Sequence, residues 1–333
     1  MRISDLRRKF MQYRRFGRTD WMVSDIGYGM WGMGGWTGSD DEESLQSLQK
    51  AVDLGCNFFD TAYVYGNGRS EALLGKLVKA NPDKQIYTAT KIPPKTMQYP
   101  TPPESTLEDC YPPDHIEDFL HKSLKNADLE AFDLLQIHTW HDGWADEDSW
   151  SNMLDSLKQQ GLIRACGISL NRWEPWNGIK AVKSGKIDSV QVIYNIFDQN
   201  PEDQLFPTCL ENDVAVIARV PFDEGTLTGT LTKETIFPAD DWRSHYFSKE
   251  NLIPSVERAD ALKPLVAEGS TMPEMALRHI LSHEAVSTII PGMRKVHHVE
   301  SNIAASDKGK LSDDLLEELK KHRWVRKPAP WSD

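Results

Sequence analysis

Several features typical of other protein classes are absent from this chain of 333 residues. It has no apolar run of the roughly 18 residues needed to cross a bilayer. The N-terminal stretch MRISDLRRKFMQYRR is charged and lacks the apolar segment of a signal peptide. The four cysteines show no CxxC or other metal-ligand spacing; they are Cys56, Cys110, Cys166 and Cys209. We therefore expect a cytoplasmic protein with buried free thiols, no membrane association and no metal.

Positive charge is also scarce. The chain has 38 Lys and Arg residues against 50 Asp and Glu residues, giving a net charge of -12. This balance disfavours nucleic acid or an anionic membrane as the main partner, because both are bound through clustered positive charge. A small anionic ligand is still compatible with the sequence, since it needs only a local group of donors.

Short apolar runs alternate with amphipathic stretches along the chain. We expect strands at residues 25–29, 57–61, 85–91, 132–138, 165–169, 189–194, 214–220 and 287–291. Strands separated by helices form parallel βαβ units, and eight such units close into a (β/α)8 TIM barrel of the α/β class. An open doubly wound sheet is the alternative, and the absence of a GxGxxG motif after the first run disfavours it.

The expected domain organisation is simple. Residues 1–11 are interpreted as an N-terminal arm, and residues 12–333 as a single barrel domain that begins with a β-hairpin over residues 14–23. Two connections, residues 93–113 and 223–256, are unusually long. Both follow strands at their C-terminal ends, where barrel enzymes build their active sites. We therefore expect both loops to contribute to function.

Four polar residues stand at the C-terminal ends of the second, third and fourth runs. They are Asp60 and Tyr65 in FFDTAYVYG, Lys91 in IYTATKI and His138 in FDLLQIHTW. Tyr65 is a suitable proton donor to a substrate oxygen on which negative charge grows. An ammonium such as Lys91 lowers the pKa of a nearby phenol. Asp60 would hold that ammonium, and His138 would orient the substrate oxygen.

Two neighbouring residues compete for these roles. His141 is a rival of His138, but the run LLQIH ends at His138 and places His141 farther out in the loop. Tyr63 is a rival of Tyr65, but only Tyr65 directly precedes a glycine. We favour Tyr65 and His138.

Over about residues 12–321, the motifs DTAxxYG, strand-end lysine and LLxxH resemble those of the aldo-keto reductase family. The resemblance implies reduction of an aldehyde or ketone with NADPH, or with NADH, and the catalytic set Asp60, Tyr65, Lys91 and His138. It also implies cofactor contacts from residues at strand ends and in the loops that follow. These are Gly32, Ser169, Asn171, Gln191, Arg219, Pro221, Phe222, Gly225, Leu227, Gly229, Gly292, Arg294, His298 and Asn302.

The sequence departs from the family pattern at several of these positions. Leu170 separates a serine and an asparagine that are usually adjacent, so Ser169 and Asn171 both stay open as carboxamide ligands. Arg219 stands where relatives carry an aromatic residue, and it is able either to stack or to reach a phosphate. His298 replaces a glutamine. Arg294 and Lys295 suit the extra phosphate of NADPH.

Tryptophans follow several strand ends and suggest an aromatic wall for a small carbonyl substrate. They are Trp31, Trp36, Trp140, Trp144 and Trp173. We assign substrate contacts to Trp31, Tyr65, His138 and Trp140. The sequence leaves the oligomeric state open.

Two other functions remain as alternatives. One is a non-catalytic or slow redox sensor that binds a nicotinamide nucleotide on the same fold. The other is a metal-assisted hydrolase, which would need more carboxylate and histidine residues at strand ends than Asp60 and His138.

Overall fold

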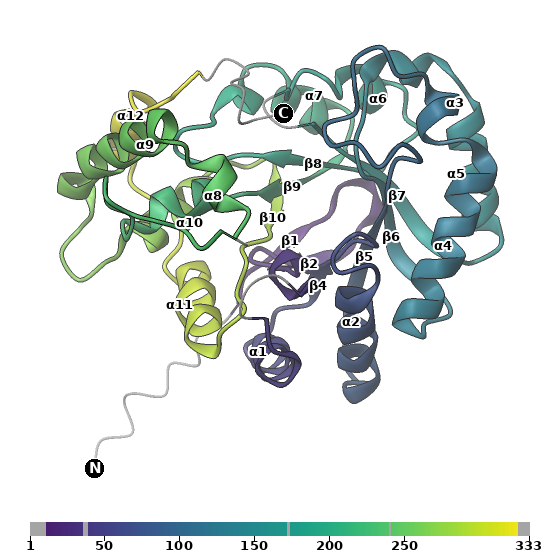
Figure 1. Ribbon diagram of the computed structural model, residues 1–333, viewed down its shortest axis with the longest axis horizontal. Helices are drawn as coiled ribbons and strands as arrows, with labels where there is room; N and C mark the ends of the chain where they lie inside the picture. Colours follow the sequence, from purple (N-terminus) through teal and green to yellow (C-terminus); the bar gives the residue numbers. More distant parts are fainter. Residues whose placement is uncertain (1–10, 36–38, 172–173, 240, 326–333) are drawn as a thin grey trace.

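The computed structural model describes residues 11–35, 39–171, 174–239 and 241–325. Within them, eight parallel strands follow one another in chain order, and helices surround them (Figure 1). The strands are β3 (Tyr28–Gly29), β4 (Phe58–Asp60), β5 (Tyr87–Ile92), β6 (Phe132–Ile137), β7 (Ile163–Ser169), β8 (Ser189–Ile193), β9 (Ala215–Arg219) and β10 (Val286–Ile289). All eight lie within the expected runs or a few residues from them, which confirms the (β/α)8 barrel.

The barrel closes where the first strand of the sheet meets the last. Parallel bridges join Ile26 to Ile289 and Gly29 to Gly292. The backbone N–H of Gly27 donates to the carbonyl of Ile289 at 2.8 Å. A Cβ atom at Gly29 would lie 2.5 Å from the carbonyl oxygen of Ile290, so this close approach requires glycine.

Alternation along the strands sorts the barrel interior into an apolar end and a polar end. A buried cluster fills the N-terminal end and includes Phe58 of β4, Leu134 of β6 and Ile217 of β9. Each of these residues is followed two positions later by a polar one. Because successive side chains alternate between the two faces of a strand, both residues of each pair point into the barrel. The polar residues therefore gather at the C-terminal end of the barrel.

The expected hairpin is present, and it covers the apolar end of the barrel. Its strands are β1 (Tyr13–Arg15) and β2 (Met22–Ser24), which pair antiparallel. Phe16 and Trp21 between them belong to the buried cluster, and their rings stack at 5.7 Å. Residues 1–10 of the expected arm lie outside the described residues, and Met11 is buried in the main core.

The helices that alternate with the strands match the amphipathic stretches. They are α1 (Asp41–Asp53), α2 (Arg69–Ala80), α4 (Pro113–Ala127), α5 (Ser149–Gln159), α6 (Ile179–Lys183), α7 (Leu205–Glu211), α10 (Met272–Ser282) and α11 (Val296–Asp307), followed by α12 (Asp313–Lys320). Asp40 caps α1 by accepting a hydrogen bond from the backbone of Glu43 at 2.8 Å. A Cβ atom at Gly75 would lie 1.7 Å from the carbonyl oxygen of Ala127, so α2 and α4 pack in close contact.

The two long connections contain more helix than the sequence suggested. Residues 93–113 contain the short helix α3 (Leu107–Cys110). The expectation of a loop over residues 223–256 is only partly correct, because α8 (Arg243–Tyr246) and half of α9 (Lys249–Leu262) fall within it. Pro254 stands inside α9, where a proline usually ends or kinks a helix. Leu252 and Val256 of the same helix pack with Tyr246 and Phe247 in a small separate core.

All four cysteines are buried and form no disulfide, in agreement with the expectation of free thiols. None of the helices in the described ranges has both the length and the apolar character needed to span a bilayer.

Candidate active site

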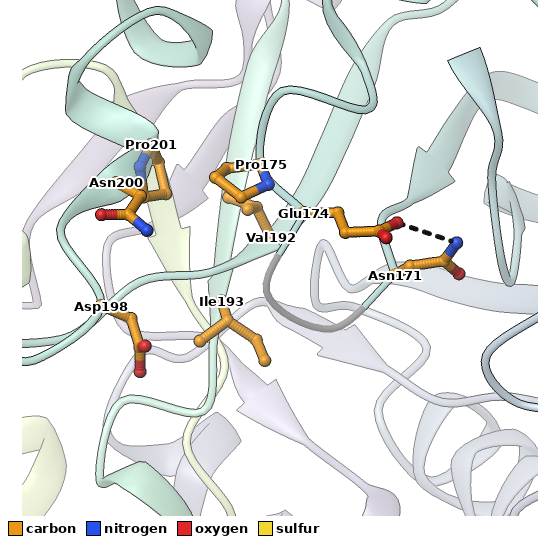
Figure 2. Close-up of a pocket in the computed structure, with 8 residues that line it drawn as sticks. All are labelled: Asn171, Glu174, Pro175, Val192, Ile193, Asp198, Asn200 and Pro201. Carbon is orange, nitrogen blue, oxygen red and sulfur yellow. Dashed lines mark hydrogen bonds between the residues drawn. The ribbon is translucent and has the colours of Figure 1, made fainter. Parts of the chain in front are cut away.

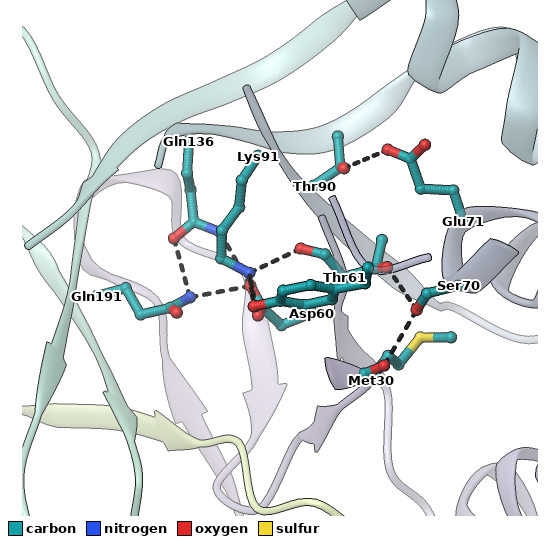
Figure 3. A network of polar contacts seen from close by, with 10 residues as sticks. Met30, Asp60, Thr61, Ser70, Glu71, Thr90, Lys91, Gln136 and Gln191 are labelled. Carbon is teal, nitrogen blue, oxygen red and sulfur yellow. Dashed lines mark hydrogen bonds and ion pairs between the residues drawn. The ribbon is translucent and has the colours of Figure 1, made fainter. Parts of the chain in front are cut away.

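The four expected catalytic residues come together at the C-terminal end of the barrel. Asp60 ends β4, Lys91 lies in β5, and Tyr65 and His138 follow β4 and β6. Lys91 Nζ forms an ion pair with Asp60 and donates to the carbonyl of Thr61 at 2.7 Å, as Figure 3 shows. The same nitrogen lies 3.5 Å from the Tyr65 hydroxyl. The lysine side chain is fully buried, so its charge acts where water does not screen it.

Two glutamines complete the surroundings of Asp60. Gln136 Nε2 and Gln191 Nε2 each donate to Asp60 Oδ2 at 2.9 Å, and Gln191 also donates to Gln136 Oε1 at 3.1 Å (Figure 3). Sequence reasoning missed Gln136. Its signal was available, because it is a polar residue inside an apolar strand and lies on the same face as His138, two positions later.

The net acidity of Tyr65 differs from the expectation. Burial raises the pKa of Tyr65 most strongly, and Asp60 raises it further. Lys91 and Arg219 lower the pKa of this phenol but do not offset burial, so the pKa stays above its usual range. Tyr65 is therefore protonated at neutral pH and is able to give up a proton only to a strong base.

His138 is held as a neutral imidazole. Burial, together with the positive charges of Lys91 and Arg219, lowers the pKa of His138 well below its usual range. Its ring meets the Tyr65 ring at a centroid distance of 6.0 Å and an interplanar angle of 78°. Its Nδ1 atom has no hydrogen-bond partner within the described part of the chain.

The two alternative candidates, Tyr63 and His141, make structural contacts instead. The ring of Tyr63 packs on Phe119 at 4.7 Å, outside the barrel. His141 Nε2 bonds with the carbonyl of Thr101 at 3.0 Å, and its ring packs on Trp144. These contacts leave Tyr65 and His138 as the tyrosine and histidine beside Lys91.

Tyr99, in the long connection after β5, also reaches this end of the barrel. Its ring lies 5.2 Å from the His138 ring, at an angle of 69°. Sequence reasoning did not find Tyr99, because nothing in a proline-rich loop indicates which residue turns inward.

Ser169 and Asn171 lie at the C-terminal end of β7 and are both buried. Asn171 Nδ2 donates to the carbonyl of Trp140 at 3.2 Å and to Glu174 Oε2 at 3.4 Å. Its Oδ1 atom is buried and accepts no hydrogen bond from any described residue. The side chain lines a pocket between the ends of β7 and β8, shown in Figure 2 with Glu174, Pro175, Val192, Ile193, Asp198, Asn200 and Pro201.

Arg219 is the last residue of β9, and its positive charge acts on Tyr65 and His138. Its Nη2 donates to the carbonyl of Leu170 at 2.9 Å. Its charge lowers the pKa values of both Tyr65 and His138. The site thus combines two cations, Arg219 and Lys91, with one carboxylate, Asp60.

The loop after β9 has an unusual backbone. Val220, Glu224, Gly225 and Gly229 have φ values of 56°, 56°, 109° and 72°. A positive φ at a β-branched residue such as Val220 is rare and strained. Pro221 is buried and Phe222 half-buried, while Leu227 is fully buried in a cluster with Phe197 and Met272.

A positive region follows β10. Gly292 precedes Arg294 and Lys295, and α11 begins at Val296 without a side-chain cap on its first backbone N–H groups. A Cβ atom at Gly32, which follows β3, would lie 3.6 Å from Arg294 Cδ, so these two segments are neighbours. Farther along α11, His298 is exposed, whereas Asn302 is buried.

The tryptophans divide into two groups. Trp31 is 41% exposed and meets Trp242 edge-on at 5.7 Å. Trp140 is fully buried and packs against Trp144 and Trp150, so it does not face a ligand in this structure and is not retained as a substrate contact. Trp36 and Trp173 lie outside the described residues.

No group of three or more histidine, cysteine, aspartate or glutamate side chains in the described ranges is arranged to hold a metal ion. The polar end of the barrel instead presents a phenol, an ammonium, a neutral imidazole and a guanidinium. These groups are suited to donate protons and to stabilise negative charge on oxygen.

Comparisons with known proteins agree with this chemistry. The sequence profile described as "Aldo/keto reductase family" matches residues 25–323. The chain is 30% identical over 322 residues to the oxidoreductase YqkF of Bacillus subtilis (strain 168), covering 94% of this chain and 96% of that protein. It is 27% identical over 305 residues to the NADH-specific methylglyoxal reductase of Escherichia coli (strain K12), covering 87% and 91% respectively.

A solved structure gives the same result for the fold. The glycerol dehydrogenase from Gluconobacter oxydans superposes with a TM-score of 0.76 and 25% identity, covering 98% of this chain and 99% of that one. The matched profile spans most of the chain, and the relatives align over nearly their full lengths. This protein therefore belongs to the aldo/keto reductase family, whose members are oxidoreductases that use nicotinamide cofactors.

Proposed function

We propose that this protein reduces a small aldehyde or ketone to an alcohol, with NADPH as the hydride donor and Tyr65 as the proton donor. The observation that carries the proposal is the position of Lys91 Nζ, 3.5 Å from the Tyr65 hydroxyl and paired with Asp60. A phenol beside a buried cation is able to release a proton and leave a stabilised phenolate.

The residues present fit a nicotinamide cofactor. The uncapped N-terminus of α11, with Arg294 and Lys295 beside it, suits a phosphate group. The buried Asn171 Oδ1 atom is an acceptor without a partner among the described residues, as a carboxamide N–H requires. When bound, the reduced nicotinamide supplies the hydride that reaches the carbonyl carbon.

The residues of the chain hold the carbonyl and move the proton. The carbonyl oxygen has two lone pairs, one for the Tyr65 hydroxyl and one for the N–H group of the His138 imidazole. As the carbon receives hydride, its oxygen becomes a strong base and takes the Tyr65 proton. Lys91 and Arg219 stabilise the phenolate, which recovers a proton from solvent once the alcohol leaves.

The raised pKa of Tyr65 suits this sequence of events. A phenol that stays protonated at neutral pH is ready as an acid before hydride arrives. Because Tyr65 gives up its proton only to the developing alkoxide, proton transfer follows hydride transfer to the same substrate.

The choice of NADPH over NADH rests on Arg294 and Lys295. A guanidinium and an ammonium near a helix N-terminus favour a dianionic phosphate. The E. coli relative, named as NADH-specific, makes this choice the first to test.

The test is cofactor oxidation by the purified protein with an activated aromatic aldehyde, run in parallel with NADPH and NADH. Many turnovers, with a higher kcat/KM for NADPH, are the expected result. Turnover with NADH favoured would keep the reductase and reject the role given to Arg294. Tight cofactor binding without turnover on a panel of aldehydes and ketones would reject the reductase in favour of a redox sensor.

A further inference from the structure

We propose that Tyr99 determines which carbonyl compounds the site accepts, by hydrogen bonding to an oxygen on the carbon next to the carbonyl. The preferred substrates would then be 2-hydroxy or 2-oxo aldehydes and ketones, rather than simple alkyl ones. This inference rests on the proposed reductase function.

Tyr99 and Tyr65 approach the same imidazole. The ring of Tyr99 lies 5.2 Å from that of His138 at 69°, and the ring of Tyr65 lies 6.0 Å from it at 78°. Both are edge-to-face contacts. A carbonyl group bound between Tyr65 and His138 would therefore lie close to Tyr99. Tyr99 reaches this position from a different loop, the one after β5.

The Tyr99 hydroxyl is available for a ligand. No described residue hydrogen-bonds to it, and Tyr99 is 41% exposed, so a ligand can reach it. Tyr111, in the same connection, shows the contrast, since its hydroxyl bonds with Thr139 Oγ1 at 2.9 Å and accepts from the Thr139 backbone at 3.0 Å. Partial burial raises the pKa of Tyr99 above its usual range, and Tyr65 raises it further, so the hydroxyl remains a donor.

The loop that carries Tyr99 is fixed on both sides. Thr101, two residues later, is buried and its hydroxyl bonds with that of Thr139, which directly follows His138. At the start of the loop, His115 Nε2 bonds with the carbonyl of Pro93 at 2.8 Å. Anchored in this way, Tyr99 needs little rearrangement to bind a substrate.

The lone pairs of the substrate determine what Tyr99 binds. Tyr65 and His138 already use both lone pairs of the carbonyl oxygen. The Tyr99 hydroxyl, as a third donor, therefore finds no free lone pair on the carbonyl oxygen. The nearest other acceptor that a substrate can offer is an oxygen on the carbon next to the carbonyl. A hydroxyl or a second carbonyl there completes the hydrogen bonding of Tyr99, whereas an alkyl group leaves the phenol to water.

The test compares Tyr99→Phe with the wild type on two aldehydes that differ by one oxygen, 2-hydroxypropanal and propanal. We expect kcat/KM for 2-hydroxypropanal to fall about five- to tenfold, the range for one neutral hydrogen bond, and kcat/KM for propanal to change less than about twofold. The loss should lie mainly in KM. Each substrate is compared with itself across variants, so its free-aldehyde fraction cancels.

Tyr13→Phe is the matched control, because Tyr13 is similarly exposed but bonds with the carbonyl of Gly55 near the other end of the barrel. It should leave both aldehydes unaffected. Equal losses on the two aldehydes, or no loss on either, would overturn the role of Tyr99.

A binding arm separates this inference from the proposed function. Calorimetry with 1,2-propanediol and 1-propanol, on protein saturated with NADPH, measures the same discrimination without turnover, because neither alcohol can accept a hydride. If the wild type reduces no carbonyl compound but Tyr99→Phe still weakens the diol selectively, the reductase is rejected and the Tyr99 site stands. If turnover is normal and the diol is bound equally by both proteins, the Tyr99 site is rejected alone.

Discussion

The side-chain amide of Gln191 donates to Oδ2 of Asp60 at 2.9 Å, and this contact joins β8 to β4 across the inside of the barrel. Gln136 donates to the same oxygen at the same distance, while Lys91 pairs with the other oxygen. The buried carboxylate is thus surrounded by donors from three other strands. Such an arrangement satisfies a buried charge and fixes the lysine beside Tyr65.

Removing either glutamine amide should destabilise the fold. Gln136→Leu and Gln191→Leu each remove one hydrogen bond to a buried carboxylate, which costs about 1.5–3 kcal/mol of unfolding free energy. Urea unfolding measures this loss. The two variants are controls for each other, since only Gln191 is expected to bind a cofactor carboxamide, and only Gln191→Leu should also weaken NADPH binding. Unchanged stability in both would contradict the importance of these contacts.

The proton-donor role of Tyr65 predicts a selective loss of chemistry. Tyr65→Phe removes the acid but keeps the ring against His138, so kcat should fall about 10²- to 10⁴-fold. Cofactor affinity, followed by quenching of tryptophan fluorescence, should stay near the wild-type value. Tyr63→Phe is a neighbouring control, because Tyr63 packs on Phe119, and it should keep full activity. A Tyr65→Phe enzyme with the wild-type kcat would show that another group donates the proton.

The positive region at α11 predicts a change in cofactor preference. Arg294→Ala should raise the dissociation constant of NADPH at least about tenfold, the effect of losing a charge-assisted bond, while that of NADH changes less than about twofold. Lys308→Ala, at the other end of the same helix, removes an equal charge and should affect neither. Equal weakening of both cofactors by Arg294→Ala would mean that Arg294 does not recognise the extra phosphate.

His279 predicts a loss of stability in acid. Burial, with a smaller effect of His283, lowers the pKa of His279 to about 4, and neither ring nitrogen has a hydrogen-bond partner in the described part of the chain. The unfolded chain binds a proton near pH 6.5, whereas the native chain does so only near the lower value. Stability from this residue is therefore complete above pH 6.5 and is lost as pH falls towards 4, by about 3 kcal/mol.

Unfolding in urea at pH 7 and at pH 4.5 measures this effect. His279→Leu should reduce the difference in unfolding free energy between the two pH values, whatever it does to stability at pH 7. His121→Leu, at an exposed position on α4, is the control and should leave the difference unchanged. An unaltered difference in the His279 variant would assign the acid sensitivity to other groups.

The sequence predicted the barrel and the meeting of Asp60, Lys91 and His138 for one physical reason. Parallel strands end at the same edge of a sheet, so residues at strand ends converge whatever the intervening loops do. The inward position of Gln136 follows from the same alternation and could have been predicted with it. The net pKa of Tyr65 could not, because it depends on the balance between burial and charge in three dimensions.

Loop residues were harder to place. The inward turn of Tyr99 depends on the anchoring of Thr101 by Thr139, a contact between two loops that carries no pattern in either. Trp140 shows the opposite error, since its position after a strand suggested the pocket, whereas packing with Trp150 buries it in the core. Large aromatic side chains gain most from full burial, and a position after a strand does not override that gain.

The junction of β3 and β10 also governs the order in which the molecule can be made. A ribosome releases residues 26–29 long before residues 289–292, yet these segments pair with each other. Until then the growing chain has two open sheet edges, which invite pairing with other nascent chains. The barrel can therefore close only after residue 292 has been synthesised. We expect a nascent chain that stops before this residue to need a chaperone that covers its unpaired strand edges.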